Sequence, residues 1–240
     1  MSEKPAVLIS SAIFPNVGTL YGADPKLIEP ELRLEQTKAT VNSLVQLGYE
    51  TIYIADNSGP NWRAGTEECL APATVLRFDH LQFSNKGISE LYLLQAALPQ
   101  LPPNTRIIKV SGRYVLKRRL HQELGSADFL FKLYKRFRNR SYVSTVAYVV
   151  RDKAIYEIFV EQSLRELFAY AVRVVGFRSL FRIVRNSVAP QYDHYPYHDP
   201  GTSVELAMWR VLRIHRYRVL YIDQLGIEGI SGVYRRVHTE

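Results

Sequence analysis

The sequence has little that would cross-link the chain or place it in a bilayer. Cys69 is the only cysteine in 240 residues, which excludes an internal disulfide and favours a reducing compartment. No run of about 18 apolar residues exists, so no membrane span is predicted. Residues 1–5 are too short and too polar for a signal peptide. There is also no Pro/Gly/Ser-rich linker, low-complexity tract or internal repeat, so we expect one domain over residues 1–240 in the cytoplasm.

Acidic residues are scarce in the middle of the chain. The net charge is +8, and residues 1–60 are net acidic. Residues 106–140 hold only Glu123 and Asp128 against eleven cations: Arg106, Lys109, Arg113, Lys117, Arg118, Arg119, Lys132, Lys135, Arg136, Arg138 and Arg140. This distribution favours phosphates, nucleic acid or anionic lipid as partners. A solvated basic face is the alternative.

Apolar runs in the first half alternate between strand and helix patterns. Strands are predicted over residues 6–14, 50–59, 73–80 and 105–116, with one helix ending at Gly48 and another over 85–98. The strands are apolar throughout, as expected when helices cover both faces of a sheet. The predicted fold class is therefore α/β, with a mostly parallel, doubly wound sheet related to the Rossmann type.

The second half has a helical and basic character. We predict a strand over 141–150, a long helix from 151, a helical piece over 176–187, a loop over 188–201, a helix over 202–216, a strand over 217–227 and a polar tail. Arg178, Arg182 and Arg185 fall on one helical face beside bulky apolar residues, as in a helix that lies on a membrane surface. A buried helix pair with an arginine-rich outer face fits the same pattern.

Polar residues follow the ends of the predicted strands, where such sheets bind ligands. They are Ser10 and Ser11, then Asp56 and Asn57, then Asn85, Lys86 and Gly87 at a helix start, then Lys109, Ser111 and Arg113. A carboxylate suits a ribose or base edge, a helix N-terminus favours an anion, and two cations suit a diphosphate. Each feature alone also fits a simple turn, an exposed loop or a surface ion pair.

Three segments resemble the GT-A-type nucleotide-sugar glycosyltransferases. They are "IYIADNSG", "NKGISELYLLQAAL" and "TSVELAMWRVLRIHRYRVLYI". The "KVSGRY" segment is similar to a bacterial surface-polysaccharide and lipopolysaccharide branch, where it replaces the acidic metal-binding motif. The resemblance implies a nucleotide-sugar-binding half over 1–116 and an acceptor-side half over 117–240, with basic helices over 152–187. It also implies a glycan or lipid-linked acceptor and a peripheral place at the inner face of the cell membrane.

The resemblance departs from the family at the metal site. The segment "KVSGRY" has no acid where the family has Asp-x-Asp. We therefore expect a metal-independent enzyme without a cofactor, in which Lys109 and Arg113 replace the cation. Fixed positive charges can stabilise the negative charge that develops on a leaving phosphate.

A second departure concerns the catalytic base. Ser203 stands where the family usually has an aspartate, and Glu205 follows it. An inverting transfer needs a base for the acceptor hydroxyl, and Glu205 is the first candidate, with His198 and Asp199 as rivals. Glu205 also fits a first-turn acid that interacts with the helix dipole. A retaining mechanism would need no such base.

The loop "VAPQYDHYPYHDPG" is rich in tyrosine and histidine. Tyr195 and Tyr197 suit stacking on the sugar faces of an acceptor. A packed aromatic loop is the alternative, and metal binding by the histidines and aspartates is a weaker one, so no metal ligands are predicted.

Two other function classes fit parts of the sequence. A nucleic-acid-binding module would use the basic residues 106–140 and their interleaved aromatics, but it leaves the strand-end residues unexplained, and we expect no nucleic acid partner. A sugar nucleotidyltransferase ranks lower, because that class usually carries cations in the loop after its first strand, and here no cation occurs between residue 6 and Lys26.

Overall fold

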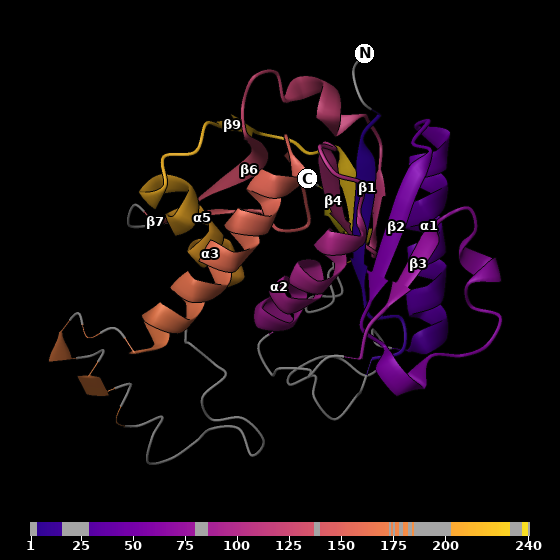
Figure 1. Ribbon diagram of the computed structural model, residues 1–240, viewed down its shortest axis with the longest axis horizontal. Helices are drawn as coiled ribbons and strands as arrows, with labels where there is room; N and C mark the ends of the chain where they lie inside the picture. The colour runs from indigo at the N-terminus through magenta and orange to yellow at the C-terminus, as the bar shows by residue number, and fades with distance from the viewer. Residues whose placement is uncertain are drawn as a thin grey trace.

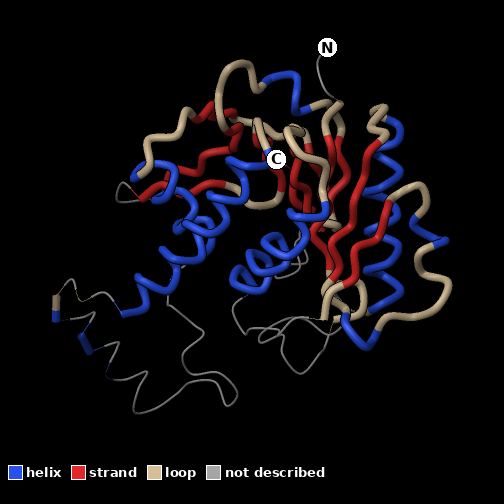
Figure 2. Tube along the Cα trace, viewed as in Figure 1, coloured by secondary structure: helices blue, strands red, loops and turns tan. Residues whose placement is uncertain are grey.

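The computed structural model describes residues 4–15, 29–79, 86–136, 140–172, 203–230 and 237–239, with 174, 176, 177, 180, 181 and 184. Its centre is an eight-stranded sheet with the order β3-β2-β1-β4-β8-β6-β7 and with β9 beside β6 (Figures 1 and 2). The strands are β1 Ala6–Ser11, β2 Thr51–Asp56, β3 Thr74–Arg77, β4 Ile107–Ser111, β6 Phe129–Arg136, β7 Arg140–Val143, β8 Ala147–Val150 and β9 Val219–Ile222.

The half of the sheet that carries the strand-end residues is parallel. Strand β1 lies between β2 and β4, with Leu8 opposite both Tyr53 and Lys109, and β3 continues the parallel order beyond β2. Beyond β4, strand β8 is antiparallel to β4, and β6 is antiparallel to β8. Strand β9 is parallel to β6. The predicted α/β fold with a mostly parallel sheet is confirmed.

Helices cover both faces of the sheet, as Figure 1 shows. Helix α1, Pro30–Gln46, packs on one face, and α2 Lys86–Ala97, α3 Lys153–Val172 and α5 Val204–Ile214 pack on the other. Proline near its first position favours the start of α1, and Gly48 with a positive φ follows its end. Short 3₁₀ helices lie at η3 Gly59–Asn61, η4 Glu68–Leu70, η5 Leu98–Gln100 and η6 Leu120–Glu123.

The segment 105–116 is two strands, so its prediction as one strand was wrong. After β4 the chain turns at Gly112, where Arg113 N donates to Ser111 O at 2.7 Å. The next strand, β5 Tyr114–Leu116, leaves the main sheet and pairs with β10 Ile227–Ile230, which pairs with β11 Val237–Thr239. The predicted polar tail therefore supplies strands of a second sheet. The break puts "KVSGRY" where two sheets separate.

Strand β6 in the basic part of the chain has no counterpart among the predicted strands. It pairs with β7 in an antiparallel arrangement, and the rings of Tyr134 and Tyr142 stack with centroids 4.9 Å apart. The predicted strand 141–150 is divided between β7 and β8, and the predicted strand 217–227 between β9 and β10. In each case a short polar loop interrupts the apolar run.

Two hydrophobic layers fill the fold. One lies between the sheet and α2, α3 and α5, and the other between the sheet and α1. Side chains alternate along β4, so Ile107 belongs to the first layer and Ile108 and Val110 to the second. The same alternation turns Lys109 into the first layer, next to Tyr148. Among the described helices, none is both long enough and apolar enough to cross a bilayer.

Candidate functional site

A cavity of about 180 Å³ lies beyond the carboxyl ends of β1 and β4. Parallel strands in α/β sheets commonly present ligand sites at this edge. Its lining comes from the strand ends, from α1, from the first turns of α2 and from the loop after β2, and includes Ser10, Ser11, Arg33, Thr37, Asn57, Lys86, Ser89, Glu90, Ser111, Gly112 and Arg113. The structure therefore brings together predicted residues from all four strand ends.

Close packing at Gly112 fixes the floor of the cavity. A Cβ atom at Gly112 would lie 3.2 Å from Ser11 Oγ and 3.3 Å from Ile9 Cγ2. Gly112 N donates to Ser10 O at 2.9 Å, and Thr37 Oγ1 lies 3.2 Å from Gly112 O, to which it donates. These contacts join β1, β4 and α1, and a larger residue at 112 would have to push them apart.

Three cations line the cavity from three elements. Arg33 comes from α1, Lys86 from the start of α2 and Arg113 from the turn after β4. Burial, followed by the nearby Arg113 charge, lowers the pKa of Arg33 to about 10. Burial, followed by the charges of Arg113 and Arg33, lowers the pKa of Lys86. The cations repel one another, so an anion among them would relieve an existing electrostatic strain.

Arg33 was missing from the sequence prediction, and its helical position explains why. It precedes the strand-end turns by a long stretch of chain and sits in a helix that the sequence marks only as amphipathic. The usable signal was its spacing to Thr37, because residues at i and i+4 share one helix face. Both residues lie on the side of α1 that faces the cavity.

Lys109 lies beneath the cavity and is not part of its lining. The residue is fully buried, with 0% of its surface exposed. Its ammonium group forms an ion pair with Glu90 of α2 and donates to Thr145 O. The ring of Tyr148 lies beside it, with the centroid 5.7 Å from Nζ. Protein groups thus surround the amine that the sequence suggested for direct phosphate contact.

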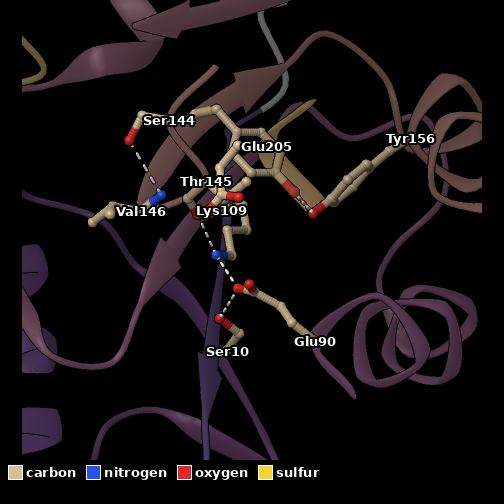
Figure 3. Close-up of polar contacts among 9 residues, drawn as sticks. Ser10, Glu90, Lys109, Ser144, Thr145, Val146, Tyr156 and Glu205 are labelled. Carbon is tan, nitrogen blue, oxygen red and sulfur yellow. Dashed lines mark hydrogen bonds and ion pairs between the residues drawn. The ribbon is translucent and has the colours of Figure 1, made fainter. Parts of the chain in front are cut away.

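Glu90 is a second lining residue that the sequence prediction omitted. Its Oε1 atom accepts a hydrogen bond from Ser10 Oγ at 2.8 Å and a second one from the Lys109 ammonium group. Figure 3 shows Ser10, Glu90 and Lys109 meeting at this oxygen. Only the spacing of Glu90 within the helix start "NKGISE" could have indicated it, since Lys86, Ser89 and Glu90 share one end of α2.

Asp56 holds the loop that borders the cavity. It is 1% exposed, and its two oxygens accept from the backbone amides of Ile13 at 2.9 Å and Ser58 at 2.8 Å. Burial raises the pKa of this carboxyl, whereas the hydrogen bonds from Ser58 and Ile13 oppose the rise. The neighbouring Asn57, rather than Asp56, belongs to the lining.

Glu205 connects to the cavity through a short polar chain. It lies in the first turn of α5, whose N-cap is Ser203, and its Oε1 atom is 3.5 Å from Thr145 Oγ1. The carbonyl of the same Thr145 accepts from Lys109. Figure 3 shows this path from Glu205 through Thr145 and Lys109 to Glu90. The sequence suggested Glu205 as the catalytic base, and the structure gives it this indirect connection to the cavity.

Other predicted site residues either lie outside the described part of the chain or do not line the cavity. Asn85, Tyr195, Tyr197, His198 and Asp199 fall outside the described residues. Gly87 is buried in the first turn of α2. Within the described ranges, no three His, Cys, Asp or Glu side chains gather closely enough to hold a metal ion.

Neither family models nor curated proteins match the sequence. Solved structures do match the fold. A nucleoside-diphosphate-sugar pyrophosphorylase from Vibrio cholerae RC9 gives a TM-score of 0.51 at 9% identity, covering 95% of this chain and 96% of that one. This similarity shows a shared fold.

Two further solved structures give lower scores. A 4-diphosphocytidyl-2C-methyl-D-erythritol synthase from Anaerococcus prevotii has a TM-score of 0.48 at 8% identity, covering 98% of this chain and 93% of that one. Mouse xyloside xylosyltransferase 1 has a TM-score of 0.46 at 11% identity, with 91% and 84% covered.

Proposed function

We propose that this protein is a glycosyltransferase that moves a sugar from a nucleotide-sugar donor to a glycan or glycolipid acceptor. The observation that carries the proposal is the cluster of Arg33, Lys86 and Arg113 around a cavity at the ends of parallel strands. Burial and, second to it, their mutual repulsion lower the pKa values of Arg33 and Lys86, so the cluster favours a ligand with more than one negative charge.

The cluster suits the leaving group of a glycosyl transfer. The bond between the anomeric carbon and the phosphate oxygen breaks, a bond to the acceptor oxygen forms, and a nucleoside phosphate or diphosphate leaves. Negative charge on that group grows in the transition state, so fixed cations bind it more strongly there than in the ground state. Arg33 and Arg113 can each offer a planar fork to phosphate oxygens.

The chemistry of the lining supports independence from a divalent metal. The fold family places its metal ligands at the end of the fourth strand, where this chain has Lys109 and Ser111. The ammonium of Lys109 and the cations above it would repel a divalent ion. Among the described residues of the lining, Glu90 is the one carboxylate, and it is already paired with Lys109. These residues do not fit a metal site.

Glu205 is the base in this proposal. A hydroxyl of the acceptor would give its proton to the Glu205 carboxylate while its oxygen attacks the donor sugar. The position of Glu205 at the start of α5 and its path to the cavity through Thr145 support this role. His198 and Asp199 stay as rival bases, and Tyr195 and Tyr197 as proposed acceptor contacts.

The acceptor side is proposed to act at an anionic membrane surface, in the synthesis of cell-surface polysaccharide. Phe177 is 86% exposed and Phe181 is 66% exposed, and Arg178 and Arg182 follow them in the sequence. Exposed aromatic residues interleaved with arginine are typical of interfacial helices. Sedimentation with phosphatidylglycerol vesicles tests this: the Phe177→Ser/Phe181→Ser variant should bind them less than the wild type does.

A product assay tests the function itself. The protein is incubated with nucleotide sugars (UDP-, GDP-, dTDP- and CMP-linked) and with extracted glycolipids, and the release of nucleotide and labelling of the glycolipid are measured. Sugar transfer supports the proposal. Failure of every donor to release nucleotide or label an acceptor would contradict it.

Sugar nucleotidyl transfer is the second candidate, because the Vibrio cholerae structure that shares the fold carries a pyrophosphorylase name. The same cavity would then bind a nucleoside triphosphate. Release of pyrophosphate from a nucleoside triphosphate and a sugar 1-phosphate would favour this candidate.

A nucleic-acid-binding role receives less support from the ion pairs. Among the described side chains of residues 106–140, five cations form ion pairs or hydrogen bonds within the protein: Lys109, Lys117 and Arg118 pair with Glu90, Glu228 and Glu123, and Arg106 and Arg119 donate to the carbonyls of His121 and Leu47. Charge used in this way is less available to a phosphate backbone.

A further inference from the structure

An acid in a cavity lined with cations calls for a separate explanation. Glu90 faces the same space as Arg33, Lys86 and Arg113. A ligand that carried only negative charge would be repelled by this carboxylate while the cations attract it. The cavity is therefore divided into a cationic part and a part that accepts hydrogen bonds.

The two oxygens of the Glu90 carboxylate have different surroundings. Both hydrogen bonds that the described residues give this side chain, from Ser10 Oγ and from Lys109 Nζ, fall on Oε1. Its second oxygen, Oε2, is left for a ligand in the cavity. An ionised carboxylate has only acceptor sites, so its natural partners are hydroxyl or N–H groups.

Lys109 makes this arrangement rigid. Its side chain is 1% exposed, and it is held from three directions by Glu90, by Thr145 O and by the ring of Tyr148. Moving the ammonium toward the cavity would break these contacts and leave a buried charge unpaired, which is costly. Lys109 therefore acts as a positioning residue that fixes the direction of Glu90.

We propose that Glu90 is a specificity-determining residue that accepts hydrogen bonds from hydroxyl groups of the donor, while the donor's phosphates lie at Arg33, Lys86 and Arg113. The inference rests on the proposed function and narrows it: the ligand is a phosphorylated polyol and not a simple polyanion. The hydroxyl groups belong either to the ribose of the nucleotide or to the sugar that is transferred. Sites that hydrogen-bond a substrate hydroxyl strongly reject analogues without it.

The test compares anions with and without hydroxyl groups by isothermal titration calorimetry. The probes are inorganic pyrophosphate, UDP and GDP, and UDP-glucose and GDP-mannose. In Glu90→Gln, pyrophosphate should bind as tightly as in the wild type or more tightly, because a repulsive charge is gone. The nucleotide sugars should bind roughly tenfold or more weakly, as for a lost hydrogen bond to a charged group.

The arms of the test separate the two sources of hydroxyl groups. If the ribose contacts Glu90, the nucleoside diphosphates lose as much affinity as the nucleotide sugars. If the transferred sugar contacts Glu90, only the nucleotide sugars lose affinity. Glu161→Gln on α3, which changes an exposed glutamate that pairs with Arg165, is the matched control and should leave all five affinities unchanged.

A second variant covers the case in which Glu90→Gln does not fold. Glu90→Met/Lys109→Met removes both charges of the buried pair, a replacement that folded proteins often accept. It should keep pyrophosphate binding and show the same loss for hydroxyl-bearing ligands.

Two results with Glu90→Gln would overturn the role assigned to Glu90 and leave the proposed function standing. They are an equal loss of affinity for pyrophosphate and nucleotide sugars, or no loss for either. A wild-type protein that binds pyrophosphate but no nucleotide or nucleotide sugar, or that binds none of these, would overturn the proposed function together with this inference.

Discussion

Arg33 of α1 and Arg113 of the turn after β4 line the same cavity, and burial together with the Arg113 charge lowers the pKa of Arg33 to about 10. The burial of Arg33 and its repulsion by Arg113 oppose folding of the ligand-free protein. Such an arrangement is common where a protein keeps an electrostatic strain for binding or catalysis. Both residues should therefore matter more for ligand binding than for stability.

The first prediction concerns the charge of Arg33. In Arg33→Met the aliphatic stem is kept and the repulsion is removed, so Tm of the ligand-free protein should rise by about 2–4 °C, the change that ~1 kcal/mol produces in a chain of this size. The affinity for pyrophosphate should fall roughly tenfold, as for a lost charged hydrogen bond. Differential scanning fluorimetry and calorimetry measure the two effects. Arg165→Met, at an exposed arginine of α3, is the control; a lower Tm with unchanged pyrophosphate affinity would argue against the assignment.

The second prediction concerns pH. The pKa values of Arg33 and Lys86 are lowered, so both cations lose their protons at a lower pH than usual. Anion affinity should be present at neutral pH and should fall as pH rises toward 10, measured with sulfate, whose charge is constant in this range. In the ligand-free protein the effect on stability has the opposite sign: the cost of burying the two charges and their repulsion act below the lowered pKa values and are relieved as pH rises through them.

A variant that lacks the charges of Arg33 and Lys86 is the control for the pH dependence of sulfate affinity. In Arg33→Met/Lys86→Met, sulfate affinity should be low and nearly constant between pH 7 and 10. A wild-type affinity that stays constant over the same interval would show that these cations do not titrate with the ligand, which contradicts the prediction.

The third prediction separates a structural role of Asp56 from a ligand contact. Asp56→Ala leaves the amides of Ile13 and Ser58 without their acceptor, so the free energy of unfolding without ligand should fall by about 1–3 kcal/mol for each amide left unsatisfied. Urea unfolding measures the change. Unaltered stability combined with a lost affinity for nucleotide would instead assign Asp56 to the ligand.

The fourth prediction concerns Glu205. In Glu205→Gln, kcat for sugar transfer should fall by roughly 10²–10⁴, the usual contribution of a general base, while donor affinity should hardly change. Thr145→Val, which removes only the hydroxyl near Glu205, should have a smaller effect in the same direction. Full activity of Glu205→Gln would assign the base to residues 198–199 or indicate a retaining mechanism.

The sequence was most informative where local pattern decides structure. The apolar runs around Ile9, Ile54 and Ile108 identified buried parallel strands, because both of their faces are covered by helices. Since ligand sites follow the ends of such strands, Ser10, Asn57, Lys86 and Arg113 could be selected before any geometry was known. All four line the cavity.

The remaining features depend on contacts between distant segments. Lys109 looks like a strand-end cation in the sequence, but alternation along β4 turns it into an apolar layer where Glu90 neutralises it. Arg33 reaches the cavity only because α1 packs against the turn at Gly112. No local pattern encodes these pairings, and the second sheet formed by β5, β10 and β11 likewise depends on a long-range pairing.

The central claim is that Arg33, Lys86 and Arg113 bind the diphosphate of a nucleotide sugar without a metal. Calorimetric titration of the best-binding nucleotide sugar, in EDTA and in Mn²⁺, into the wild type and Arg113→Ala tests it most directly. The account predicts one site whose affinity is the same in EDTA and Mn²⁺ and falls about tenfold or more in Arg113→Ala, the loss of a charged hydrogen bond. Binding that disappears in EDTA and returns with Mn²⁺, or that Arg113→Ala leaves unchanged, would contradict it.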